Sequence, residues 1–328
     1  MAVSTNTAYL AAGGQVYGID LKTQSSWKYP EKANAKGFYA NPVLTPDEQL
    51  LVPSYDDILY SLDPATGNLK WKFPQSSSDV HRSKGRLIAS PLVIQDTIYQ
   101  PSSDSHLYAL DLQGNYKWDA TTGGALWAAP ATDPTCGCIY VASMDRYVYK
   151  FNATDGSLIK KSPDLGGAIV GTPAVGSDGT LYVGTFGKEM YALNGSDLSI
   201  KWRFATHDWV WAGPALANNV LYFGDLAGYF YALNTADGTA SFGQLQVNNP
   251  IVDTPLVSGE KIYFTAESDT LYMVDTTGNI TSKVVGGQIY SAPIDAGDTI
   301  LVAPTNFTAQ LVALSLDGSQ KWVFPPPK

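Results

Sequence analysis

Aromatic and cationic side chains gather in a few short segments of this chain. Four aromatic residues each stand three positions before a proline, and a loop that begins at Pro74 collects basic side chains. The candidate ligand or partner residues are Tyr39, His81, Arg82, Lys84, Arg86, Trp127, His207, Asp208, Trp209, Trp211 and Tyr290. Amphipathic rings stack on sugars, quinones or peptide side chains, and cations attract acidic groups. Two alternatives stay open: the rings pack the end of a channel, or the basic loop is simply solvated.

Patterns that carry catalysis are not found in the sequence. It contains no Gly-x-Ser-x-Gly and no His-Glu-x-x-His, and none of its glycine pairs opens a predicted helix as a phosphate loop would. Five aspartates recur at similar places and either ring one face as cation ligands or bond their own backbone in turns. They are Asp57, Asp104, Asp145, Asp225 and Asp269. We favour turn residues, and predict no catalytic residue and no metal ligand.

The two cysteines, Cys136 and Cys138, are separated only by Gly137. A local disulfide in a turn and two free thiols at a surface hairpin are both compatible with this spacing. Two sulfurs without neighbouring histidines do not make a metal site, and so sparse a use of cysteine says little about the compartment.

A repeated segment must position these residues. It consists of an apolar-Tyr-Ala-Leu-Asp strand, a turn and a strand closing on Trp, as in Leu59-Tyr-Ser-Leu-Asp-Pro-Ala-Thr-Gly-Asn-Leu-Lys-Trp71. Aligned copies place one docking position in each, at Trp27, Trp71, Trp118, Lys160, Trp202, Phe242, Ser282 and Trp322. The period is about 40 to 45 residues, as a four-stranded propeller blade requires.

Each repeat divides into four short strands, the first led by proline and the third and fourth joined by a glycine turn. The alternation of apolar and polar residues predicts half-buried strands. We therefore predict an all-β chain, an eight-bladed β-propeller of four-stranded antiparallel blades forming one domain over residues 1–328. The chain begins at a first strand and ends after a fourth, so no strand should be exchanged between its termini. Such flush ends suggest a piece trimmed from a longer protein.

These copies resemble the pyrroloquinoline-quinone (PQQ)-type propeller repeat, with its Ala-x-Asp-x-x-Thr-Gly-x-x-x-Trp docking motif. The resemblance implies that Trp27, Trp71, Trp118, Trp202 and Trp322 lie between adjacent blades and have a structural role. Blades four to seven, three of which lack the Trp, are then expected to depend more on strand packing. The family includes quinoprotein dehydrogenases, which use PQQ and calcium. It also includes non-catalytic propellers, such as the scaffold lipoprotein of outer-membrane assembly and modules of bacterial kinases.

Several features favour the non-catalytic branch. The dehydrogenases pair adjacent cysteines and carry large insertions, whereas here Gly137 separates the cysteines and the blades are nearly bare. We expect a binding or scaffold propeller with no cofactor, recognising a protein or glycan through the inter-blade loops. The alternatives are a PQQ-dependent alcohol or sugar dehydrogenase, or a relic that binds the quinone, and the sensor ectodomain of a membrane kinase.

Composition narrows the remaining choices. The net charge of −9 disfavours a nucleic-acid partner, because the phosphate backbone repels an acidic surface. No apolar run reaches the roughly 18 to 20 residues that span a bilayer, and the first residues do not read as a signal peptide. The family resemblance implies an extracytoplasmic location, and we expect a monomer.

Overall fold

The structure is a computed structural model that describes residues 1–76, 78–305 and 310–324. The regular secondary structure of these residues is β-strand throughout. They fall into two compact units, Met1–Ser162 and Pro163–Lys328, and each unit is described by itself. A single domain over residues 1–328 stays a prediction.

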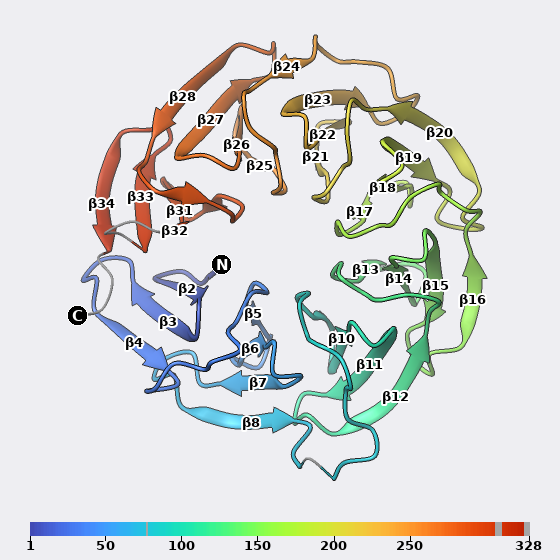
Figure 1. The fold of residues 1–328 in the computed structure, drawn as a ribbon, viewed down its shortest axis with the longest axis vertical. Coiled ribbons are helices and arrows are strands. Elements are labelled where there is room, and N and C mark those ends of the chain that lie inside the picture. The colour runs from blue at the N-terminus through green and yellow to red at the C-terminus, as the bar shows by residue number, and fades with distance from the viewer. Residues whose placement is uncertain (77, 306–309, 325–328) are drawn as a thin grey trace. The chain divides into compact units, whose positions relative to one another are not determined.

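The first unit consists of four four-stranded antiparallel sheets, each built from strands consecutive in the sequence (Figure 1). Each sheet is one blade. The strands are β1 (Ala2–Val3), β2 (Thr7–Ala12), β3 (Gln15–Asp20) and β4 (Ser26–Tyr29); β5 (Val43–Leu44), β6 (Leu50–Pro53), β7 (Leu59–Leu62) and β8 (Leu69–Phe73); β9 (Leu92–Ile94), β10 (Thr97–Pro101), β11 (His106–Asp111) and β12 (Tyr116–Thr121); β13 (Ala131–Asp133), β14 (Cys138–Ala142), β15 (Val148–Asn152) and β16 (Leu158–Lys161).

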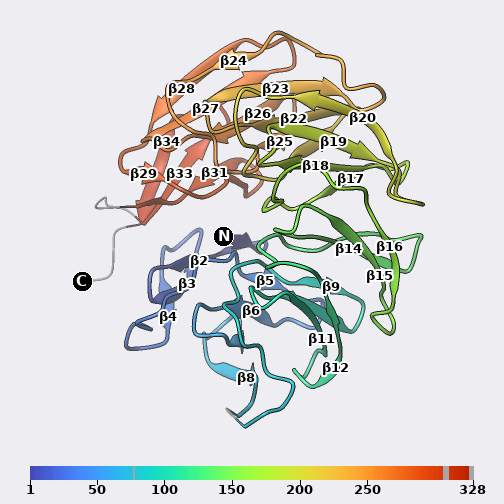
Figure 2. The same ribbon diagram turned by 45° about the vertical axis from the view of Figure 1, so that its right-hand side comes forward.

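The second unit repeats this plan with four further blades (Figure 2). The strands are β17 (Ala174–Val175), β18 (Leu181–Thr185), β19 (Glu189–Leu193) and β20 (Ile200–Ala205); β21 (Ala215–Ala217), β22 (Val220–Gly224), β23 (Tyr229–Asn234) and β24 (Leu245–Gln246); β25 (Leu256–Ser258), β26 (Lys261–Thr265), β27 (Thr270–Asp275) and β28 (Ile280–Val284); β30 (Ile294–Asp295), β31 (Thr299–Val302), β33 (Leu311–Ser315) and β34 (Gln320–Phe324). An additional short ladder pairs β29 (Gln288–Ile289) with β32 (Pro304–Thr305).

These eight blades confirm the predicted fold class, an eight-bladed β-propeller of four-stranded antiparallel blades. In the described residues, the first blade consists of β1 to β4 and the last of β30, β31, β33 and β34, so the prediction that no strand is exchanged between the termini is also confirmed. Within a blade, the antiparallel order places the turn between the second and third strands at the same end as the inter-blade loops. We call this end the loop face, and the end with the other two turns the turn face.

The hydrophobic core of each unit lies between neighbouring blades. One cluster, for example, joins Leu51 and Leu59 of the second blade to Ile98 and Leu110 of the third. The second strands β10, β14 and β18 are buried along their whole length, so the predicted half-burial is wrong for them. The reason is that a blade in the array packs on a neighbour at both faces, which removes the solvent-facing side that produces alternation.

Four of the five predicted docking tryptophans, Trp27, Trp71, Trp118 and Trp202, lie at seams between blades. The seam role of Trp322 stays a prediction. Trp27 donates from Nε1 to the Pro64 carbonyl at 3.0 Å, across the seam to the turn between the third and fourth strands of the next blade. Trp71 and Trp202 reach Leu112 and Thr235 in the same way, each at 3.0 Å. A glycine of that turn lies under each ring, and a Cβ at Gly67 would collide with Trp27.

Two seams of the second unit replace the tryptophan with other apolar side chains. Phe242 lies over Gly278 where a tryptophan would lie, and the Met273 side chain packs on Gly318. Phe242 also falls outside a strand: β24 is confined to Leu245–Gln246, and the Ser241 N–H bonds the Ala232 carbonyl instead. Side-chain packing on the turn glycine therefore persists without the motif residue.

Candidate functional site

The loop face has a repeated main-chain frame. The N–H of one residue in the turn between the second and third strands donates to a carbonyl of the loop entering the same blade, at 2.9 to 3.1 Å. The pairs are Tyr55 with Gly37, Ser103 with Arg86, Met144 with Ala125, Phe186 with Ala168, Leu226 with Trp209, and Glu267 with Pro250. Loops and turns are thus tied together, which holds the side chains they carry in place.

Aspartates reinforce this frame. Tyr108 on β11 donates to Asp104 at 2.8 Å, and the same carboxylate accepts the Lys84 N–H of the incoming loop at 2.7 Å. In the second unit the buried Asp225 accepts the Tyr231 hydroxyl at 2.7 Å and the N–H groups of His207 and Asp208 at 3.1 Å each. Burial and the Asp225 acceptor raise the pKa of Tyr231.

These contacts support the structural interpretation for three of the five recurrent aspartates. Asp104, Asp145 and Asp225 each accept a tyrosine hydroxyl, and Asp104 and Asp225 also accept N–H groups of their own turns, as structural acceptors would. The role extends beyond bonding their own turns, since Asp104 and Asp225 also hold the incoming loop. In the part of the chain that the structure describes, no group of three or more His, Cys, Asp or Glu residues is placed to hold a metal ion.

In the first unit, four of the predicted residues come together. Tyr39 meets Tyr55 edge-on at 4.5 Å between ring centroids, and the Arg86 guanidinium lies 4.8 Å above the Tyr55 ring. Lys84, Arg86 and Trp127 line a hollow of about 600 Å³ with Tyr55 and Lys36. Tyr39 is 66% exposed and Trp127 37%. The arrangement offers flat rings and cations side by side.

The other two predicted residues of the basic loop, Arg82 and His81, lie in different surroundings. Arg82 lines an adjoining hollow of about 480 Å³ together with Lys84. His81 lines neither hollow, because its ring stacks on Tyr116 of β12 at 3.9 Å and 12°. Burial and a hydrogen bond to Asp119 raise the pKa of Tyr116 to about 12, so the phenol stays neutral beneath the imidazole.

In the second unit, Trp209 and Trp211 form an aromatic cluster around Phe186. The Phe186 ring stacks on Trp209 at 4.6 Å and 10°, and lies 5.4 Å from the Trp211 ring. Both tryptophans are partly exposed, Trp209 at 42%. Tyr290 lies on the last inter-blade loop, between β28 and β30, with its hydroxyl bonded to Gln288 at 2.9 Å.

His207 and Asp208, which directly precede Trp209, are held by contacts outside this cluster. The His207 ring stacks on Tyr229 at 3.7 Å, and its Nδ1 lies 2.9 Å from the Tyr231 hydroxyl. Asp208 pairs with Lys188 at 3.1 Å, and the hydrogen bond from Lys188 lowers the pKa of the Asp208 carboxyl. Their side chains therefore fix the loop that presents Trp209.

Sequence reasoning missed Lys36, Tyr55 and Phe186. Tyr55 and Phe186 occupy the same position in the turn after the second strand, where the frame bond begins. An alignment of that turn would have shown aromatic residues in two blades, beside Ser103, Met144, Leu226 and Glu267 in others. Lys36 carries no such signal, because only the folded loop brings it to Arg86.

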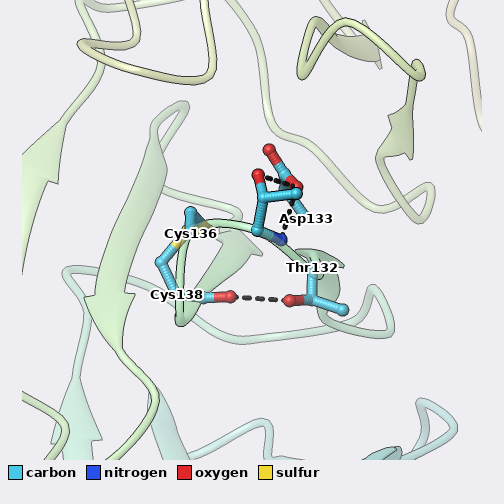
Figure 3. Close-up of a disulfide and its surroundings, with 5 residues drawn as sticks. Thr132, Asp133, Cys136 and Cys138 are labelled. Carbon is cyan, nitrogen blue, oxygen red and sulfur yellow. Dashed lines mark hydrogen bonds between the residues drawn. A yellow bond between two sulfur atoms is a disulfide. The ribbon is translucent and has the colours of Figure 1, made fainter.

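The cysteines form a disulfide, Cys136–Cys138, which resolves the alternative that the sequence left open (Figure 3). It lies in the turn between β13 and β14, and Thr132 donates to the Cys138 carbonyl at 2.8 Å beside it. This turn belongs to the turn face. The disulfide is therefore at the end of its blade opposite the aromatic and cationic loops.

Comparison with known proteins identifies the family. The model of the family described as outer membrane protein assembly factor BamB matches residues 1–129 and 144–279. BamB of Legionella pneumophila (strain Paris) is 26% identical over 186 residues, which are 53% of this chain and 47% of that protein. BamB of Yersinia pestis is 26% identical over 247 residues, 65% of this chain and 62% of that protein.

A tetrathionate hydrolase of Acidithiobacillus ferrooxidans is 29% identical over a shorter segment, 127 residues, which are 31% of this chain and 26% of that protein. The chain thus spans less than two thirds of the length of each of these curated relatives.

Solved structures agree on the fold. BamB from Moraxella catarrhalis superposes with a TM-score of 0.75 at 14% identity, over 94% of each chain. A computationally designed protein, Ika8, superposes with a TM-score of 0.79 at 13% identity, over 99% of this chain and 95% of the other. At these identities the likeness concerns the fold alone. In the described residues, no helix is long and apolar enough to cross a membrane.

Proposed function

Because the chain belongs to the family described as outer membrane protein assembly factor BamB, we propose that it is a non-catalytic scaffold that binds protein outside the cytoplasm. Its curated BamB relatives are named for the assembly of outer membrane proteins, and we assign this chain a role of that kind. The proposed scaffold works as a monomer, and it needs neither PQQ, calcium nor a nucleic acid.

One observation carries the proposal: the loops present partly exposed aromatic rings whose backbone is fixed. Tyr39 and Trp127 in the first unit, and Trp209 in the second, keep 37 to 66% of their surface accessible. Large rings on rigid loops provide contact area at low cost in conformational entropy, which is why they anchor protein interfaces. The polar groups below them already have partners within the frame, as those of Asp225 show.

The dehydrogenase alternative has no comparable support. Its family expectation is a disulfide beneath the quinone, but the Cys136–Cys138 disulfide lies on the turn face. The rings and cations lie on the loop face instead.

Site-specific photo-cross-linking in the source organism tests the proposal. Tyr39 or Trp209 is replaced by p-benzoylphenylalanine, and Leu158, a 56% exposed residue on the outer strand β16, serves as the matched control. We expect both loop positions, but not the control, to cross-link to a protein of outer-membrane assembly. Equal adducts from all three positions, or none from the loops, would refute the proposal. So would alcohol oxidation by the purified protein supplied with PQQ and calcium.

A further inference from the structure

A basic groove crosses the loop face of the first unit, although the chain as a whole carries a net charge of −9. It consists of the hollows of about 600 and 480 Å³, which share Asp57 and Lys84 and therefore adjoin. Cations outnumber carboxylates in its lining, with Lys36, Lys72, Arg82, Lys84 and Arg86 against Asp56 and Asp57. We call it the cationic groove.

Three of these cations have no carboxylate partner within the described residues. Lys36, Lys84 and Arg86 take part in none of the ion pairs found there at 4.0 Å or less. Asp56 is already engaged, because its Oδ2 accepts Asn34 at 2.7 Å and Tyr60 at 2.8 Å. Among the described residues, the lining of the groove therefore keeps more cations than carboxylates.

The backbone that carries these cations is held in place. The Lys84 N–H bonds Asp104 at 2.7 Å, and the Arg86 carbonyl accepts the Ser103 N–H at 3.1 Å. The buried Ser83 hydroxyl lies 2.8 Å from that of Ser102. Beside Lys36, the Gly37 carbonyl accepts the Tyr55 N–H at 3.1 Å. Such anchoring reduces the entropy lost when a ligand orders the side chains.

Aromatic rings border the same cations. Tyr55 lies beneath Arg86 and against Tyr39, and Trp127 lines the groove with them. A ligand here would meet cations and flat apolar surface within one hollow. An ion as small as phosphate would use the charges and leave the rings and the second hollow uncovered.

We propose that the cationic groove binds an extended acidic peptide segment of the partner protein. Its carboxylates pair with Lys36, Lys84 and Arg86, and an aromatic or apolar side chain packs on Tyr39 and Trp127. The inference rests on the proposed function, since it names the chemistry of the partner. Charge complementarity selects this occupant: an acidic segment is repelled by most of this acidic protein and attracted at the groove.

Fluorescence anisotropy of two labelled peptides tests the inference on the purified chain. The probe is fluorescein-Gly-Asp-Phe-Glu-Asp-Phe-Glu-Gly, and its neutral counterpart carries Asn and Gln in place of Asp and Glu. The groove variant is Lys84→Ala/Arg86→Ala. The matched control, Lys22→Ala/Lys70→Ala, removes two exposed cations of the same unit near its turn face.

We expect the acidic peptide to bind at least about tenfold more tightly than the neutral one, and the groove variant to lose about tenfold in affinity. The control variant should bind as the wild type does, and the affinity should fall from 50 to 500 mM salt. Equal binding of both peptides, or an equal loss in the control variant, would overturn the inference. So would phosphatidylglycerol vesicles or inorganic phosphate binding the groove where the acidic peptide does not.

These outcomes are separable from failure of the proposed function. Cross-linking from Tyr39 without acidic-peptide binding would leave the scaffold role standing and remove only the peptide chemistry. Peptide binding without any cross-link in cells would leave a functional groove in a protein that is not an assembly scaffold.

Discussion

The seam between the first two blades makes a specific prediction for Gly67→Ala. Gly67 has φ +74° in the turn over which Trp27 lies, and an added Cβ would collide with the Trp27 ring. The ring cannot easily yield, because its Nε1 is bonded to the Pro64 carbonyl at 3.0 Å. A left-handed alanine costs about 1 kcal/mol, and overpacking a tight site adds about 2 kcal/mol. We expect Gly67→Ala to lower the free energy of unfolding by about 3 kcal/mol.

Gly13→Ala is the matched control. Gly13 also has a left-handed backbone, φ +58°, but an added Cβ meets nothing within 4 Å. It should therefore cost about 1 kcal/mol, the conformational part alone. Urea unfolding followed by circular dichroism measures both variants, and the same pair in a Trp27→Ala background closes a mutant cycle. If Gly67→Ala and Gly13→Ala cost the same, or if Trp27→Ala fails to relieve the difference, the seam argument is refuted.

Three further predictions concern the rest of the frame. Asp225→Asn should lower the free energy of unfolding by about 3 kcal/mol, because an amide nitrogen must face N–H donors whichever way it turns. Urea unfolding compares it with Asp237→Asn, a control at an exposed turn, and an equally small effect of both substitutions would contradict the prediction. Burial raises the pKa of Asp253 to about 7, against a hydrogen bond from Thr265, although part of the residue stays accessible. Protonation is thus easier in the folded state, so this group's contribution is present below about pH 4 and is lost as the pH rises through 7. Asp253→Asn should then be about 2 kcal/mol more stable than the wild type at pH 8 and equal to it at pH 4 in thermal unfolding, and a constant difference would exclude this titration. Replacing both cysteines by serine should cost less than about 2 kcal/mol in urea unfolding, since the disulfide closes a very short loop; a larger loss would mean that it supports more than its turn.

The architecture was predictable because each repeat encodes its own seam. Trp71 and Gly114 belong to different blades, yet a tryptophan and a turn glycine of this kind recur in several repeats, so the period in the sequence reports both the blade and its contact. Phe242 departs from the motif, because a phenylalanine replaces the tryptophan. It still lies on Gly278 as a tryptophan would, although β24 is short and begins only at Leu245. There the turn glycine marks the seam more reliably than the aromatic residue does.

The candidate site was predictable only in part. Position before a proline predicted Tyr39, Trp127 and Trp211, because each of these residues stands on an inter-blade loop. The sequence could not show that His81 lies apart from the cations of the basic loop. Its ring stacks on Tyr116, which belongs to a strand of the following blade. Such a contact depends on side chains brought together by folding, and no local pattern reports it.

The polar chemistry of the loop face divides into a frame and a surface. The carboxylates of Asp104 and Asp225 accept tyrosine hydroxyls and loop N–H groups, so they serve to hold the loops. A catalytic or metal-binding use of these groups would break the contacts that position the loops. Lys84 and Arg86 differ, because their main-chain atoms belong to the frame while their side chains line the groove. This division of roles supports the proposed recognition of a partner, because the displayed cations and rings can be substituted while the carboxylates that fix the loops stay intact.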